Sequence, residues 1–298
     1  MNSIGSQLCL LFMWIATGFV ANKAKVLTSE AEGYFSSFLI KIALPASTIS
    51  AVLGDSGASA GLVAEACAVA AAVFVLLPVA AQIIGKFVPL APVYKLLMIY
   101  PNLGFMGIPV ISSIYGTDSV VYVSMFMIFF NLSLFSYGET IMGSGGFSLK
   151  KIINPGSIAS AAALVIFILG IGIPEPFSRL FESVGNITSP LAMIVIGSSI
   201  ASVRLGELIR DKRTLVCAAV RVFIVPLILF AVLLPLDIDK TVMGISVLLM
   251  SMPVAGNVPM LCMAHGSESS TASGGLCIST LLSLITIPLY AYIFAYVF

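Results

Sequence analysis

The chain has 298 residues, of which 59% are hydrophobic and 9% charged, and its net charge is +1. A soluble domain carries about a quarter of its residues as Asp, Glu, Lys and Arg, so this chain could not cover itself with a hydrated surface. The composition therefore indicates an all-α polytopic membrane protein and excludes a sizeable soluble domain. The net charge by itself indicates no class of partner.

Apolar runs between polar breaks predict ten membrane-spanning helices, because each span needs about 20 apolar residues. The expected ranges are 6–21, 30–53, 60–85, 93–115, 118–141, 155–173, 180–203, 213–236, 240–265 and 271–297. The breaks include "YGTDS", "PEPFSR" and "LDID". The N-terminal run "LCLLFMWIATGFV" lacks the basic start and the cleavage site of a signal peptide, so we expect it to remain as the first span.

The Lys and Arg residues between these spans predict the orientation of the chain, because cytoplasmic loops are enriched in them. Alternate connections hold ten of these residues, and the opposite connections hold only Arg179 and Lys240. The ten are Lys23, Lys25, Lys86, Lys95, Lys150, Lys151, Arg204, Arg210, Lys212 and Arg213. This split requires an even number of spans. It places both termini outside the cytoplasm and the 142–154 loop inside it.

The 142–154 loop divides the chain into two five-span halves, 1–141 and 155–298. Because five is odd, two similar halves would have opposite orientations in the membrane. The fourth span contains "PNLGFMGIP" (101–109), and the ninth contains "MPVAGNVPM" (252–260). Matched interrupted helices of this kind are typical of inverted repeats.

The two interruptions predict a substrate site. Proline removes a backbone donor and clashes with the preceding turn, and freed backbone groups survive in a membrane only inside protein or beside a water-filled cavity. Half-helix N-termini there attract anions, and the amides of Asn102 and Asn257 can donate hydrogen bonds. We expect substrate contacts from these two residues and from Gly104, Gly107 and Gly256, and hinges at Pro101, Pro109, Pro253, Pro259 and Pro45. The alternative is that the prolines only kink the helices, and the matched pair of breaks favours the site.

These motifs resemble the auxin efflux carrier family, which includes the plant PIN-type carriers and bacterial malate and malonate permeases. The resemblance rests on "YPNLGFMGIPVISSIYG", "MPVAGNVPMLCMAHG", "ISTLLSLITIPL" (278–289) and "LIKIALPASTIS" (39–50). It covers almost the whole chain. The long hydrophilic loop of many plant members is absent, as in the bacterial members, which implies a multi-pass protein of the bacterial inner membrane.

The resemblance implies two inverted five-helix repeats with helices 4 and 9 crossing, as in the sodium–proton antiporter and bile-acid symporter folds. It also implies elevator-type transport of small organic anions such as malate, malonate or auxin-like acids. Asn102 matches the asparagine of the family's first crossover. Asn257 lies where plant carriers have an apolar residue, so the resemblance supports its role less well.

Two basic residues fall within predicted spans. Lys41, four residues before Pro45, would be costly at mid-membrane. It is either a counter-ion for the substrate or a paired or snorkelling lysine, and the sequence leaves both interpretations open. Arg221 lies a turn before Pro226, and we expect it near the cytoplasmic end with its side chain snorkelling to the interface.

Other polar residues in the spans receive ordinary interpretations. Glu65 and Glu139 could carry a coupling proton, but carboxylates at the membrane rim are the simpler explanation. His265, the only histidine, receives no role. Ser198 and Ser199 are expected to serve close helix packing.

No enzyme, cofactor or metal site is expected, because the chain lacks a nucleotide loop, GxSxG, HExxH and paired intramembrane carboxylates. The leading hypothesis is a secondary transporter of small organic anions. Two alternatives stay open: a sodium-coupled symporter of the bile-acid type and a non-transporting receptor. A sodium–proton antiporter is disfavoured because no span interior contains Asp. The expected partners are the organic anion, a coupling proton or sodium ion, and lipid, with a homodimer left open and no nucleic acid.

Overall fold

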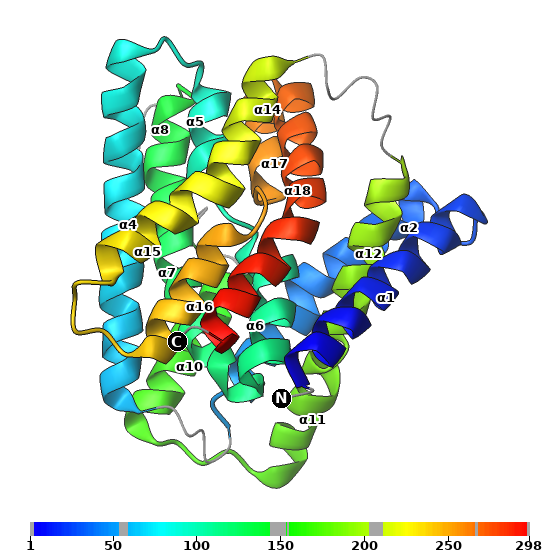
Figure 1. The fold of residues 1–298 in the computed structure, drawn as a ribbon. Coiled ribbons are helices and arrows are strands. Elements are labelled where there is room, and N and C mark those ends of the chain that lie inside the picture. Colours follow the sequence, from blue (N-terminus) through cyan, green and yellow to red (C-terminus); the bar gives the residue numbers. More distant parts are fainter. Residues whose placement is uncertain are drawn as a thin grey trace. The chain divides into compact units, whose positions relative to one another are not determined.

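The computed structural model describes residues 3–53, 59–143, 153, 155–202, 211–265 and 268–296. Throughout these ranges the chain is helical, with short connections (Figure 1). Most of the predicted cytoplasmic loop, 142–154, lies outside the described residues, as do four of the ten loop cations used above: Lys150, Lys151, Arg204 and Arg210.

The first half of the chain contains α1 (Ser3–Lys23), α2 (Ser29–Phe38), η1 (Leu39–Ala43), α3 (Leu44–Ser50), α4 (Ala60–Phe87), α5 (Pro92–Ile99), η2 (Leu103–Gly107), α6 (Ile108–Tyr115), η3 (Thr117–Ser119), α7 (Val120–Ser133), η4 (Leu134–Gly138) and α8 (Glu139–Ile141). The second half contains α10 (Pro155–Leu169), α11 (Glu175–Gly185), α12 (Thr188–Ser202), α14 (Lys212–Ala219), η5 (Val220–Ile224), α15 (Val225–Leu233), α16 (Lys240–Ser251), α17 (Asn257–Ala264) and α18 (Ser269–Tyr296).

Among the described residues, five helical stretches are long and apolar enough to cross a membrane: 60–87, 117–141, 175–201, 212–233 and 269–294. Shorter apolar helices cover 9–23, 103–115, 155–169 and 240–251. These lengths and compositions agree with a multi-pass membrane protein. The count of ten spans and the inverted repeat stay predictions. The break predicted at "PEPFSR" lies slightly earlier: the connection after α10 ends at Pro174 and α11 begins at Glu175, so most of this motif is helical.

The helices pack into two compact units. Unit 1 comprises residues 1–64, 104–128 and 153–203, and unit 2 comprises residues 65–103, 129–152 and 204–298. Each unit therefore takes helices from both halves of the sequence. The division into repeats 1–141 and 155–298, which concerns internal similarity rather than packing, stays a prediction.

Three of the helices widen just before a proline. The wide turns η1, η2 and η5 end two residues before Pro45, Pro109 and Pro226, respectively. Proline lacks an N–H and its ring clashes with the carbonyl of the preceding turn. A π-type turn, with its i→i+5 hydrogen bonds, gives that carbonyl more room while the helix continues. Pro45 thus follows a widened turn within a continuing helix, and its role as a hinge stays a prediction.

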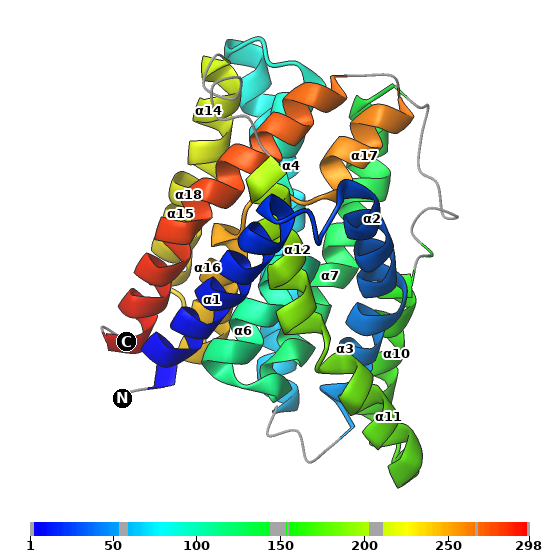
Figure 2. The ribbon, with the colours of Figure 1, turned by 90° about the vertical axis from the view of Figure 1, so that its right-hand side faces the viewer.

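Unit 1 is held together by an unusually close crossing of α1 and α12, which lie side by side in Figure 2. A Cβ atom at Gly18 would lie 1.9 Å from the carbonyl oxygen of Ile194. Likewise, a Cβ atom at Gly197 would lie 1.9 Å from the carbonyl oxygen of Ile15. Each helix thus presses its backbone against a glycine of the other, an approach that small residues alone permit.

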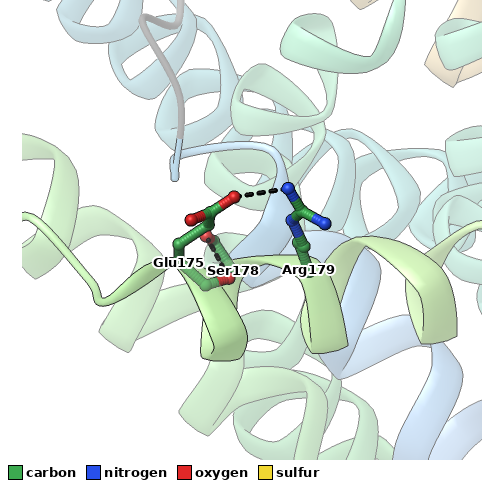
Figure 3. A network of polar contacts seen from close by, with 3 residues as sticks. All are labelled: Glu175, Ser178 and Arg179. Atoms are coloured by element: carbon green, nitrogen blue, oxygen red, sulfur yellow. Dashed lines mark hydrogen bonds and ion pairs between the residues drawn. The ribbon is translucent and has the colours of Figure 1, made fainter.

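The helix α11 shows the contrasting case of an exposed polar contact. Arg179 and Glu175, one turn apart, form an ion pair, and the Ser178 hydroxyl donates a hydrogen bond to the backbone carbonyl of Glu175 (Figure 3). The two charged side chains are 76% and 71% exposed. An exposed pair of this kind contributes little to stability.

Candidate functional site

The first predicted break is present in unit 2. The helix α5 ends at Ile99, and Tyr100 is extended, with φ −101° and ψ 107°. Pro101 follows and has no N–H to offer a helix. The helical path resumes at Leu103. Residues 100–102 are therefore a short extended segment, which we call the first break.

The second break lies between α16, which ends at Ser251, and α17, which begins at Asn257. Met252 is extended, with φ −62° and ψ 149°, and Pro253 follows it. Pro259, in contrast, lies within the first turn of α17, a position at which a helix tolerates proline because the N–H has no intrahelical partner there. Residues 252–256 therefore form the second break, and Pro259 belongs to the helix that follows it.

The two breaks lie antiparallel and bond to each other. The N–H of Asn102 donates to the carbonyl of Pro253 at 2.7 Å, and the N–H of Ala255 donates to the carbonyl of Tyr100 at 2.9 Å. Pro101 and Val254 form the bridge between these bonds. Backbone groups freed by the prolines thus satisfy one another, as a hydrocarbon surrounding requires. The two interruptions therefore lie side by side within unit 2.

A third hydrogen bond comes from α18. The N–H of Val254 donates to the hydroxyl oxygen of Ser279 at 2.9 Å, and the Ser279 hydroxyl donates to the carbonyl of Leu276 at 3.0 Å. Ser279 is fully buried. Nothing in the sequence distinguishes Ser279 from the other serines of α18, although it lies in "ISTLLSLITIPL", one of the stretches that carry the family resemblance.

Tyr100 anchors the first break from the other side. Its hydroxyl shares a 3.1 Å hydrogen bond with the hydroxyl of Ser133, and its ring lies edge-on to Phe130, with 5.6 Å between the ring centroids. Tyr100 is fully buried. Its polar tip and its apolar ring are therefore both satisfied, which holds the extended segment in place.

The two asparagines lie at the edges of these breaks. Asn102 is the last residue of the first break, and Asn257 is the first residue of α17. Both side chains are half-buried. The first N–H groups of α17 lack partners within their own helix and carry its positive end. Beside Gly256, an added Cβ atom would meet no atom within 4 Å, so open space adjoins the second break.

The other predicted site residues belong to unit 1. Lys41 is exposed, within the wide turn η1, four residues before Pro45. Gly104 lies close to Leu44, whose Cδ1 would be 3.2 Å from an added Cβ atom. Gly107 precedes α6, in which Pro109 occupies the first turn. The role of Lys41 as a counter-ion stays a prediction.

Arg221 does not lie where its place in the sequence predicts. Its side chain does not snorkel: the residue is 0% exposed, inside unit 2. The guanidinium Nη1 donates to the carbonyl oxygen of Met98 at 3.2 Å and lies 3.5 Å from that of Ile99. These carbonyls belong to the last turn of α5, directly before the first break.

Glu139 and His265 lie against each other. Glu139 is 2% exposed, so its carboxylate is buried within the protein. Its Oε2 lies 2.8 Å from Nε2 of His265, whose side chain is 15% exposed. The pair ties the C-terminal end of α17 to α8. Sequence spacing could not suggest it, because 126 residues separate the partners.

Comparison with known families identifies the kind of protein to which these helices belong. A family model described as "Membrane transport protein" matches residues 4–146 and 144–291. The chain belongs to this family. It is the auxin efflux carrier family whose crossover motifs the sequence resembles.

Relatives of this transporter include a protein of Rhizobium meliloti (strain 1021) named "Putative malonate transporter". It is 24% identical over 297 residues, which cover 93% of this chain and 91% of the relative. "Uncharacterized transporter YfdV" of Escherichia coli (strain K12) is 23% identical over 207 residues, 65% of each chain. A Shigella flexneri protein of the same name matches equally well. The family and its named relatives are membrane transporters rather than enzymes.

Proposed function

We propose that this membrane transporter is a secondary active carrier of small organic anions, and that the paired breaks of unit 2 form its anion site. The substrates would be carboxylates such as malonate or malate, or auxin-like acids. The observation that carries the proposal is the antiparallel bonding of the two breaks through Asn102, Pro253 and Ala255.

The chemistry of this segment suits a carboxylate. Backbone groups within the breaks are paired with each other and with Ser279. The side-chain amides of Asn102 and Asn257 stand at its two edges, and the positive end of α17 begins there. A carboxylate accepts hydrogen bonds from side-chain amides and from the first N–H groups of a helix. In transporters, the N-termini of half-helices near the midplane attract anionic substrates. The name of the Rhizobium meliloti relative points to the same substrate class.

We further propose an elevator-type mechanism in the bacterial inner membrane, with both termini outside the cytoplasm. The contacts of the chain define two compact units, each with helices from both sequence halves. A movement of whole domains requires that each domain keeps its internal packing while it moves. The orientation rests on the distribution of Lys and Arg between the predicted spans.

The decisive experiment is counterflow in proteoliposomes. Purified protein is reconstituted with internal unlabelled malonate, malate or indole-3-acetate, and uptake of the same labelled acid is followed against liposomes without protein. Counterflow detects a carrier whatever its direction and coupling ion. We expect accumulation of at least one of these acids. Imposed sodium, proton and voltage gradients then separate a sodium-coupled symporter from proton coupling and from uniport.

Two results would contradict the proposal. Saturable binding of an acid without counterflow would favour the non-transporting receptor. Neither binding nor counterflow of any of the three acids would reject organic anions of this class as substrates.

A further inference from the structure

Arg221 is the most deeply buried charged side chain of unit 2 among the residues that the structure describes, with an exposed fraction of 0%. It is the second residue of η5, the widened turn before Pro226. The described part of the chain offers it no carboxylate at ion-pairing distance, and its Nε has no hydrogen-bond acceptor there. A buried guanidinium without a counter-ion needs another source of negative charge.

The last turns of two helices contact the guanidinium. Nη1 contacts the carbonyls of Met98 and Ile99, in the last turn of α5. Nη2 lies 3.8 Å from the sulfur atom of Met250, in the last turn of α16. The guanidinium therefore contacts backbone carbonyls in the last turn of α5 and a side chain from the last turn of α16, the two turns that precede the first and the second break.

The charges of these helix ends and of the guanidinium are similar in size and opposite in sign. A helix C-terminus acts as roughly −0.5 of an elementary charge, so two of them amount to about −1. The guanidinium contributes +1. Without the guanidinium, the two negative helix ends beside the breaks would repel a carboxylate. They would also cancel the attraction that the positive end of α17 exerts on it.

We propose that Arg221 balances the negative ends of α5 and α16 and thereby makes the crossover of unit 2 selective for anions. Arg221 is a positioning residue: it acts through the helix ends and not by contact with the substrate. The inference rests on the proposed function, and it assigns the anion preference to a residue of unit 2 that is separate from Lys41.

The test compares charged and neutral ligands of the same shape. Binding of malonate against malonamide, and of indole-3-acetate against indole-3-acetamide, is measured by competition on the wild type, Arg221→Gln and Arg221→Lys. Loss of the charge in Arg221→Gln is expected to weaken binding of the acid about tenfold, with the amide little affected. Arg221→Lys, which keeps the charge, should restore most of the acid's affinity.

Each outcome bears on the proposal. If Arg221→Gln binds the acid as the wild type does, or if acid and amide weaken equally, the residue is structural and the proposal is wrong. If the wild type binds neither acid, the proposed function fails first, and the inference fails with it.

A second pair of variants keeps Arg221 in place in case its replacement prevents folding. Because the Met250 sulfur lies against Nη2, the carboxylate of Met250→Glu would pair with the guanidinium and cancel its charge. Met250→Gln has the same size without the charge. We expect Met250→Glu to lose the preference for acid over amide and Met250→Gln to keep it. An unchanged preference in Met250→Glu would overturn the proposal.

Discussion

The hydroxyl oxygen of Ser279 accepts a hydrogen bond from the N–H of Val254 at 2.9 Å, so a side chain of α18 satisfies the backbone of the second break. Val254 also forms the bridge to Pro101. One buried serine thus supports the segment in which the two broken helices meet.

Replacing Ser279 with Ala should leave the N–H of Val254 buried without a partner, at a cost of about 1–3 kcal/mol. We expect a lower melting temperature in detergent and less uptake of the labelled acid in the counterflow assay. Ser283→Ala is the matched control, because Ser283 is equally buried on α18 and, among the described residues, its hydroxyl bonds the Thr280 carbonyl of its own helix. Equal effects of the two substitutions would show that Ser279 has no special role at the break.

Asn102→Ala should weaken carboxylate binding by about ten- to a hundred-fold, since a hydrogen bond to a charged group contributes roughly 1.5–3 kcal/mol. Asn257→Ala should have a smaller effect. Isothermal titration with malonate or indole-3-acetate measures both. Asn131→Ala, which removes a buried amide from α7, outside the breaks, is the control for general loss of structure. Wild-type affinity in both Asn102→Ala and Asn257→Ala would mean that the substrate binds elsewhere and that the breaks act as hinges.

The crossing of α1 and α12 should tolerate no added methyl group. Gly18→Ala and Gly197→Ala each place a Cβ atom 1.9 Å from a backbone carbonyl oxygen, which no side-chain rotation can relieve. We expect a strong decrease in the yield of monodisperse protein. Gly33→Ala, on α2 with nothing within 4 Å of the new atom, should behave as the wild type. Normal yield of either crossing variant would mean that the helices are farther apart than described.

The pair of His265 and Glu139 should couple energetically, because the carboxylate is buried and the two atoms are 2.8 Å apart. A double-mutant cycle with Glu139→Gln and His265→Asn should give a coupling of roughly 1.5–3 kcal/mol in thermal unfolding. The exposed pair of Glu175 and Arg179 provides the comparison, and its coupling should be about 0–1 kcal/mol. Similar coupling energies in the two cycles would show that the buried pair contributes no more to stability than the exposed pair.

Orientation can be tested independently of transport. Single cysteines introduced at Gly146 and Asp237, in a background without the five native cysteines, are labelled with a membrane-impermeant maleimide. The split of Lys and Arg predicts that position 237 reacts in intact cells and that position 146 reacts only after permeabilisation. Labelling of position 146 from outside would end the topology prediction.

Local chemistry let the sequence alone establish the class of the protein and the positions of the breaks. Because the chain has few charged residues, its surface must face a membrane however its helices pack. Pro101 and Pro253 interrupt hydrogen bonding in their own helices whatever surrounds them. Similar content in the two interrupted spans then sufficed to predict that Asn102 and Asn257 border one site.

The packing of the helices determines contacts that the position of a residue in the sequence does not predict. Arg221 lies in an apolar run, and from depth alone it would snorkel. Instead, its guanidinium contacts a carbonyl in the last turn of α5 and the side chain of Met250 on α16, and only the positions of those helices show this. The same holds for Ser279, which is one serine among several on α18 until Val254 lies beside it. Such contacts join residues far apart in the chain, so their physics appears only once the helices are in place.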